Sequence, residues 1–210
     1  MKYYRLVTAL PSLPEGFGPL PVSLPEIVAD ILDEVEGADA ELVHALLWFI
    51  DTANAESVLL GRSHFDPRGT CTREQWETRR DLPDFLDEIL RSEESLQPAQ
   101  QVARLWNAYF SRLAFIAEKH QNRFLAQFVE VETGLRNAVA RARAEQMSID
   151  PDLAMVAGGD GAQQYQAMVL RAAEAPDPQS RERALDRERL AIYQEIEGID
   201  PFSIDAVLAY

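Results

Sequence analysis

The chain has 210 residues, which is enough for one or two domains to bury a core without disulfides or structural metals. Its 47% hydrophobic and 26% charged residues are those of an ordinary globular protein, and its single cysteine, Cys71, excludes an intrachain disulfide framework and fits a reducing cytoplasm. The net charge of −15 argues against binding to nucleic-acid phosphates, and no stretch approaches the about 18 to 20 apolar residues of a membrane span.

The N-terminal segment MKYYRLVTALPSL lacks a convincing signal-peptide core and cleavage site, so we expect it to belong to the mature fold. Tyr3 to Leu10 is the one stretch that could be extended, and Pro11 and Pro14 end it whether it is a strand or a helix. From Pro11 to Leu60 there are ten Asp or Glu and no Lys or Arg. Such a run indicates either a solvated acidic face or a surface that docks a basic partner.

Proline-free runs mark where helices can form, because proline breaks a helix interior but suits its first turn. Apolar residues at spacings of three and four predict a helix from Pro25 to Gly37, and a second helix capped by Asp39 and continuing to Gly61. Residues 62–72 are expected to form a loop, followed by shorter helices near 73–80 and 83–91.

The longest helical segment is predicted over about 98–147. Its apolar residues follow a heptad seam: Val102, Trp106, Tyr109, Leu113, Ile116, then Phe124, Phe128, Val131, Leu135 and Ala138. The seam drifts across the polar residues EKHQNR at 118–123, which predicts a bend or an exposed bridge within a rod of up to about 75 Å. Gly134 costs about 1 kcal/mol relative to alanine in a helix, and a close helix approach is one reason to tolerate it.

Two further helices are predicted over roughly 161–174 and 178–197, and a last one opens with Asp200 as its cap and Pro201 as its first residue. A helix of about ten residues is marginal alone in water. We therefore expect Phe202, Ile204 and Leu208 to pack inward against the 98–147 helices.

These elements predict an all-α protein: an elongated helical bundle with one long, bent segment over about 98–147 and shorter flanking helices. We expect one helical domain over 1–210, which could divide into sub-bundles 1–97 and 98–210. The last predicted helix has no C-cap, so we expect the natural chain to run on beyond Tyr210.

Nucleotide and hydrolase motifs are absent from the sequence. It contains no phosphate loop of the G-x-x-x-x-G-K-[ST] type, no G-x-G-x-x-G and no G-x-S-x-G. The glycine cluster GGDG at 158–161 carries an acid where a phosphate cradle needs bare amides, and it is interpreted as a loop. No cysteine or serine is accompanied by a recognisable activating base.

Metal ligation has two candidates. Glu41 and His44 form a Glu-x-x-His motif, but a helical di-iron site needs a second such motif, so His44 is expected to be a structural residue at a helix packing surface. His64, Asp66 and Cys71 share one loop, yet structural zinc usually takes four ligands and no C-x-x-C accompanies them. His120, in the polar bridge, is expected to be solvated. We expect no cofactor, no bound metal and no enzymatic activity.

Three segments resemble a family of small helical proteins encoded among the subunits of bacterial V/A-type ATPases and often labelled as similar to the C component of their central stalk. The resemblance covers most of the chain, and its two ends are the most specific parts. The matching positions are Tyr3, Tyr4, Leu6, Val7, Leu10 and Pro11 at the start, Phe124, Leu125, Leu135, Arg136 and Asn137 in the middle, and Pro201, Phe202, Asp205, Leu208 and Tyr210 at the end. The chain departs from the family after Tyr210, where family members continue with a Leu/Lys-rich stretch ending near Arg-Trp.

The resemblance implies a role similar to that of this central-stalk component, which is named C in prokaryotes and d in eukaryotes and is an all-α adaptor between the membrane rotor ring and the rotating shaft. It implies ATPase stalk and rotor-ring subunits as partners, a cytoplasmic location peripheral to the membrane through the complex, and a role in ion transport. The candidate interaction residues are Asp33, Glu34, Glu36, Phe202, Ile204, Leu208 and Tyr210. A helical scaffold unrelated to ATPases and a helical metalloprotein based on Glu41 and His44 stay open as alternatives.

Overall fold

The computed structural model of the protein describes residues 2–12, 21–92, 96–158 and 162–210. Throughout these ranges the regular structure is helical and no strand occurs, which confirms the predicted all-α fold. The helices are α1 (Tyr4–Ala9), α2 (Leu24–Glu34), α3 (Ala38–Leu59), α4 (Arg73–Thr78), α5 (Asp84–Arg91), α6 (Pro98–His120), α7 (Arg123–Met147), the 3-10 turn η1 (Pro151–Leu153), α8 (Ala162–Ala173), α9 (Pro178–Ile196) and α10 (Ile204–Ala209).

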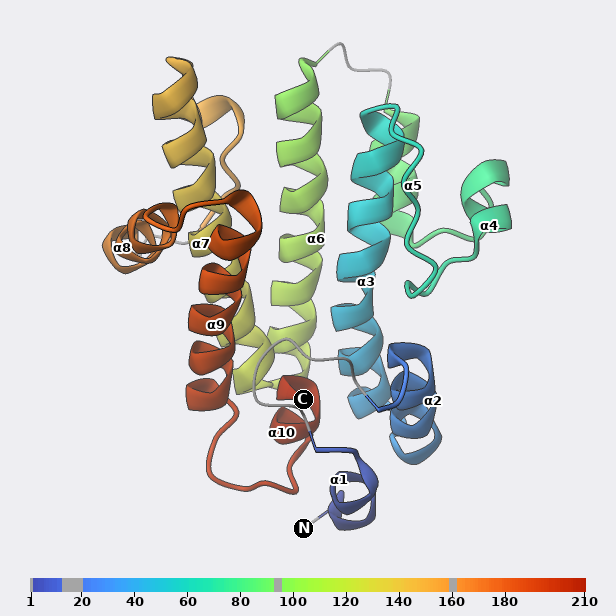
Figure 1. Ribbon diagram of the computed structural model, residues 1–210. Helices are drawn as coiled ribbons and strands as arrows, with labels where there is room; N and C mark the ends of the chain where they lie inside the picture. The colour runs from blue at the N-terminus through green and yellow to red at the C-terminus, as the bar shows by residue number, and fades with distance from the viewer. Residues whose placement is uncertain (1, 13–20, 93–95, 159–161) are drawn as a thin grey trace.

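The long helices α3, α6 and α7 stand side by side and form the body of the bundle (Figure 1). Helix α5 packs on α3 and α6 at one side, and α8 and α9 cover α7 at the other. The two short terminal helices, α1 and α10, lie with both chain ends at one end of the bundle (Figure 1). The main hydrophobic core draws on residues from both sides of position 97, from Leu42 on α3 to Leu113 on α6 and Leu208 on α10.

The first residues form a helix, α1, rather than a strand. Tyr3 and Leu6 are 4% and 3% exposed and join the main core. The Tyr3 hydroxyl and the Lys2 ammonium both donate to the Asp39 carboxylate near the start of α3. Asp39 was expected to cap that helix with its side chain, but α3 starts one residue earlier, at Ala38. Gly37, with a φ of 58°, makes the turn before it. The Asp39 carboxylate instead binds Lys2 and Tyr3 at the N-terminus.

The expected single bent segment over 98–147 is wrong: these residues form two antiparallel helices joined by a tight turn (Figure 1). Helix α6 ends at His120, and its C-cap, Gln121, adopts the left-handed conformation with φ of 51°. Asn122 then caps α7 by accepting a hydrogen bond from the Leu125 amide at 2.7 Å. A left-handed residue followed by a capping asparagine stops one helix and starts another, so the polar bridge reverses the chain instead of bending a rod.

The predicted heptad seam is confirmed as the contact line between these helices and their neighbours. Leu113 and Ile116 on α6 are 0% exposed. At the start of α7, Phe124 is 1% exposed and Leu125 is 0% exposed. The aromatic rings of Trp106 and Tyr109 pack edge to face with centroids 5.8 Å apart, an arrangement that their quadrupoles favour.

The close approach expected at Gly134 is also confirmed. The ring of Tyr165, on α8, lies so near that a Cβ atom at position 134 would be 2.4 Å from two of its carbons. Tyr165 is itself 2% exposed, so its buried ring packs directly on the backbone of Gly134. The packing of α8 on α7 therefore depends on a residue without a side chain.

The loop over 62–72 is held to α3 by two buried polar side chains. The Asp51 carboxylate, 0% exposed, accepts hydrogen bonds from the amides of Thr70 and Cys71 at 2.9 and 3.0 Å and from the Thr70 hydroxyl at 2.7 Å. Asn54 exchanges two hydrogen bonds of 2.8 Å with the backbone of Asp66. These bonds satisfy loop amides that no regular structure would otherwise pair.

The last helix starts three residues later than predicted. Ser203 caps α10 by accepting from the Ala206 amide at 3.1 Å, while Asp200 and Pro201 form a preceding turn. The Asp200 carboxylate accepts from the Phe202 amide two residues on at 3.0 Å, so its side chain is committed to that turn.

Candidate functional site

The terminal segments meet at one end of the bundle. The Tyr3 amide donates to the Phe202 carbonyl at 3.2 Å, and the rings of Tyr4 and Phe202 lie 4.9 Å apart. The Tyr210 hydroxyl donates to the Pro11 carbonyl at 2.8 Å, across 199 positions of sequence. We call this assembly of α1, α10 and residues 201–203 the end face.

Asn122 joins the end face to the turn between α6 and α7. Its amide nitrogen donates to Asp205 Oδ1 at 2.6 Å while its oxygen caps α7. Asn122 is 7% exposed, and burial raises the pKa of the Asp205 carboxyl above its ordinary value of 3.8. The polar bond thus fixes α10 on the start of α7, next to the buried Phe124 and Leu125.

Of the predicted interaction residues, those at the C-terminus lie together. Leu208 is 9% exposed and belongs to the main core, with Ile204 and Tyr210 half-buried against it. The half-buried Phe202 contacts the ring of Tyr4 on α1. These side chains serve largely to dock the chain end, so less of their surface remains for a partner than the sequence suggested.

The three acidic residues predicted to interact have different environments. Asp33 and Glu36 are exposed near the end of α2, whereas the Glu34 carboxylate accepts from Arg5 of α1. The other acids of the stretch divide similarly: Asp39, Glu41, Asp51 and Glu56 have partners within the protein, and Glu26 closes the capping box of α2. Glu15 lies outside the described residues. The exposed remainder, Asp30, Asp33 and Glu36, lies on and just after α2.

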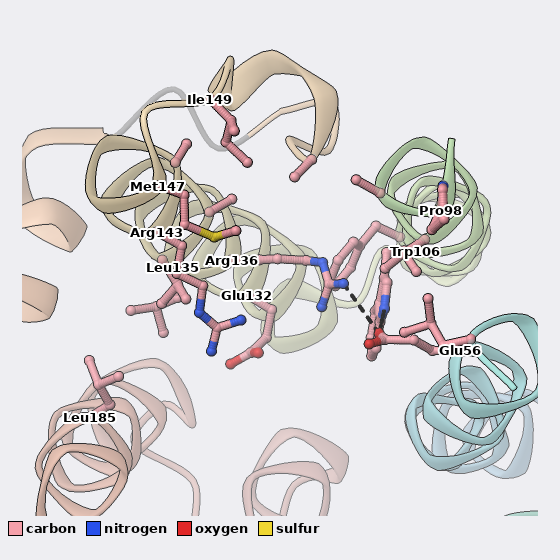
Figure 2. A pocket seen from close by; sticks show the side chains of 18 of the residues that line it. Glu56, Pro98, Trp106, Glu132, Leu135, Arg136, Arg143, Met147, Ile149 and Leu185 are labelled. Carbon is pink, nitrogen blue, oxygen red and sulfur yellow. Dashed lines mark hydrogen bonds and ion pairs between the residues drawn. The ribbon is translucent and has the colours of Figure 1, made fainter. Parts of the chain in front are cut away.

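A cavity of about 690 Å³ opens between α3, α6, α7 and α9. Its walls are mainly apolar, and Figure 2 shows Glu132, Arg136 and Arg143 projecting from α7 toward its interior. Met147 and Ile149, 68% and 47% exposed, line it where α7 ends. No local sequence motif marks this cavity, since its charged residues come from α3, α7 and α9 and from the segments that follow α3 and α7.

Glu56 connects three helices at one side of the cavity. Its Oε2 atom accepts from the Trp106 indole at 2.7 Å and lies 3.5 Å from Arg136 Nη2 (Figure 2). The Arg136 guanidinium also stands over the Trp106 ring, 4.1 Å from its centroid, in cation–π geometry. Burial lowers the pKa of Arg136 to about 10.

A second charged group lies at the other side of the cavity. The Glu132 carboxylate, on a residue that is 6% exposed, accepts from the Tyr193 hydroxyl of α9 and lies 2.8 Å from Arg189 Nε. Burial and the neighbouring carboxylate raise the pKa of the Tyr193 hydroxyl well above its ordinary value, so it stays a hydrogen-bond donor. This pair fastens α9 to α7.

Phe49, Glu132 and Arg189 also border an apolar groove of about 390 Å³ formed by α2, α3, α7, α9 and α10. Its remaining walls are Leu24, Ile27, Val28, Ile31, Val43, Leu46, Leu47, Ile50, Phe128, Tyr193, Val207, Leu208 and Tyr210. The groove is continuous with the end face through Leu208 and Tyr210.

The predicted metal-site residues do not converge, and the described part of the chain holds no group of three or more His, Cys, Asp or Glu suited to a metal ion. His64 is exposed, Asp66 is engaged by Arg68 at 2.6 Å, and Cys71 is buried at 4% exposure. Most of the GGDG segment, residues 159–161, lies outside the described residues, so the interpretation of that cluster as a loop is not addressed.

Two expectations about histidines are wrong. His44 is exposed rather than packed, and its Nδ1 atom lies 2.8 Å from the Ala40 carbonyl. His120 is half-buried rather than solvated: its Nε2 atom lies 2.7 Å from Glu41 Oε2, and Lys119 donates to the same carboxylate. Because α6 runs antiparallel to α3, its basic last turn meets the acidic first turn of α3, where the helix dipoles favour both charges.

Glu56, Glu132 and Arg189 were missed by sequence reasoning as site residues. The available signal was the position of Glu132, which directly follows the seam residue Val131 and precedes Leu135 by three. A charged residue on the flank of a buried seam must find a partner, but its partner on α9 lies far away in sequence.

None of the helices in the described ranges combines the length and apolarity needed to cross a membrane. Among family models, one described as a protein of unknown function (DUF2764) matches residues 1–177. No curated protein and no solved structure matches the chain.

Proposed function

We propose that this chain, which belongs to the DUF2764 family, is a non-catalytic adaptor of a bacterial V/A-type ATPase that sits in the central stalk between rotor ring and shaft. The proposal extends the sequence resemblance to proteins encoded with such ATPases. Its partners would be stalk and rotor-ring subunits, and its place peripheral to the membrane would come from the complex.

The observation that carries the proposal is the convergence of the resembling segments. Residues near the N-terminus (Tyr3, Pro11), the start of α7 (Phe124, Leu125) and the C-terminus (Phe202, Asp205, Tyr210) lie together at or next to the end face. The matching positions Leu135, Arg136 and Asn137 lie further along α7, so most but not all of the resembling positions belong to one structural unit. A unit formed by both chain ends on a bundle of long helices suits an adaptor that passes torque from the rotor ring to the shaft through packed contacts.

The exposed acids near the end face support a docking role. Asp33 and Glu36 lie on or just after α2, whose neighbour α1 helps to form the end face. Complementary charge at the rim of an interface mainly raises the association rate and makes it dependent on salt. A basic stalk surface would therefore be captured faster at low ionic strength.

Affinity purification of the tagged chain from a bacterium that encodes it beside a V/A-type ATPase tests the proposal. We expect stalk or rotor-ring subunits to co-purify in stoichiometric amount, and ATP hydrolysis to be absent from the chain alone. Recovery of the chain without any ATPase subunit would contradict the role and favour a scaffold unrelated to ATPases. Metal analysis of the same material decides the metalloprotein alternative.

The acidic surface has its own test within that complex. Replacing Asp33 and Glu36 by lysine should slow association at low salt and reduce its salt dependence. Glu145→Lys is the matched control, because Glu145 is an exposed acid on α7 at the opposite end of the bundle. An association rate that responds equally to both sets of changes would show that the surface near α2 has no special role.

A further inference from the structure

We propose that the central cavity binds a small monocarboxylate with an apolar body, of the size of a medium-chain fatty acid, whose carboxylate pairs with Arg136 and Arg143. This binding site is separate from the end face, and the inference does not depend on the adaptor function. Four features of the cavity support it: its volume and walls, an arginine with unused donors, a second arginine without an ion pair, and the composition of its mouth.

The volume and the walls suit an apolar body. Cavities of roughly 300–1,000 Å³ hold small organic ligands, and this one has about 690 Å³. Val102 and Phe110 of α6 face Leu135 and Val139 of α7 across it. Such walls favour a hydrocarbon chain or ring over a sugar or a nucleotide, because they offer it few hydrogen-bonding groups.

Arg136 has donors that the protein leaves unused. Its Nε atom is shielded from solvent and has no hydrogen-bond partner, and its one carboxylate contact, to Glu56, is long at 3.5 Å. Glu56 is already occupied by the Trp106 indole at 2.7 Å. Buried donors in native proteins are almost always satisfied, so an unpaired arginine nitrogen at a cavity wall indicates an anionic ligand.

The ion pairs around the cavity leave one of its arginines available. Its buried or half-buried carboxylates are Glu56 and Glu132, and the exposed Asp150 and Glu182 also line it, opposite Arg62, Arg136, Arg143 and Arg189. Glu132 is held by Arg189 and Tyr193, and Glu56 lies near both Arg62 and Arg136. The lining charges therefore balance, and one positive charge, that of Arg143, is left without an ion pair in the described part of the chain.

Arg143 supplies that remaining charge at the mouth. It follows Arg136 by seven residues on the same face of α7, and no hydrogen bond or ion pair connects it to another residue of the described part of the chain. Exposed Met147 and Ile149 lie next to it along the same rim. A cation beside apolar side chains is the surface that an amphipathic carboxylate would meet first.

Calorimetric titration of the purified full chain with decanoate, below its micellar concentration, tests the inference. We expect saturable binding near one equivalent, at least tenfold tighter than the binding of decanol. We also expect Arg136→Gln to weaken decanoate binding at least tenfold and Arg143→Gln to weaken it severalfold. Arg171→Gln is the matched control, because Arg171 is an exposed arginine on α8 paired with Glu188, and it should leave binding unchanged.

Two cavity-filling variants locate the ligand. Ala140→Phe fills the proposed site without replacing either arginine and should abolish binding, while circular dichroism shows that the chain still folds. Val28→Phe narrows the apolar groove beside α2 and should leave decanoate binding intact. Absence of saturable binding, equal affinity for decanol, or loss of binding in Val28→Phe alone would overturn the proposal, as would wild-type binding by folded Arg136→Gln.

Discussion

Tyr210 donates its hydroxyl hydrogen to the carbonyl oxygen of Pro11, so the last residue of the chain is bonded to the end of the first helical segment. A parallel contact joins the Tyr3 amide to the Phe202 carbonyl. Neither α1 nor α10, six residues each, would persist alone in water. Each helix is stabilised by burying its apolar face on the same core, and the two hydrogen bonds fix them to one another.

Leu208→Ala should therefore destabilise the whole bundle. Leu208 is 9% exposed in the main core, and truncating a buried leucine costs about 2–5 kcal/mol. Urea unfolding followed by circular dichroism measures the loss. Leu170→Ala, at a leucine of α8 that is 65% exposed, is the control and should stay within about 0.5 kcal/mol of the wild type. Equal small effects for both changes would mean that α10 does not contribute to the core.

Gly134→Ala should also destabilise the protein, although alanine is the better helix former by about 1 kcal/mol. The new methyl group would lie 2.4 Å from the Tyr165 ring, and overpacking of this kind costs about 1–3 kcal/mol. In a Tyr165→Ala background the clash is gone, and the same substitution should become neutral or stabilising. A double-mutant cycle in urea measures this change of sign. An additive cycle would show that the contact has no energetic weight.

Asp51→Ala should loosen the loop over 62–72 and lower stability. It would leave the buried amides of Thr70 and Cys71 without an acceptor, at a cost of about 1–3 kcal/mol for each unsatisfied group. Amide exchange at Thr70 and Cys71 should accelerate more than exchange along α6. Asp30→Ala, at an exposed acid of α2, provides the control and should change neither quantity. Unaltered exchange in the Asp51 variant would assign the anchoring of the loop to Asn54.

Cys71 should react slowly with iodoacetamide in the folded protein. Burial, with the nearby Asp51 carboxylate, raises the pKa of the thiol from its ordinary 9.0 to about 11. The labelling rate at pH 8 should therefore be far below that of the urea-unfolded chain, and it should rise as the pH approaches 11. Labelling of the folded protein as fast as the unfolded chain would show that the thiol is accessible.

The same shift has a consequence for stability. A thiol whose pKa is higher in the folded protein favours folding below the unfolded value, and this contribution is lost as the pH rises from about 9 toward 11. The free energy of unfolding should thus fall more steeply over this range in the wild type than in Cys71→Ala. Parallel pH profiles for the two proteins would contradict the shift.

Local signals in the sequence were sufficient to predict most helices. Prolines, caps and the spacing of apolar residues act within one or two turns, and they predicted the helices over 25–37, 39–61 and 178–197 close to their observed bounds. The glycine inside the predicted helix also raised a close helix approach as one reason for Gly134, and the Tyr165 ring lies against it. It failed at 118–123, because a polar bridge between two seams is compatible with either a bend or a reversal, and the left-handed Gln121 decides for the reversal.

Hydrophobic periodicity is a property of neighbouring residues, so it was sufficient to predict an all-α protein with a continuous buried seam. Which charges meet depends instead on how the helices pack. The contacts of Glu56 with Arg136, of Glu132 with Arg189 and of Glu41 with His120 join different helices, and each depends on how those helices pack. Side-chain ion pairs act over a few ångströms, whereas these partners are far apart along the chain, so the cavity bordered by the first two pairs exists only once the bundle has formed.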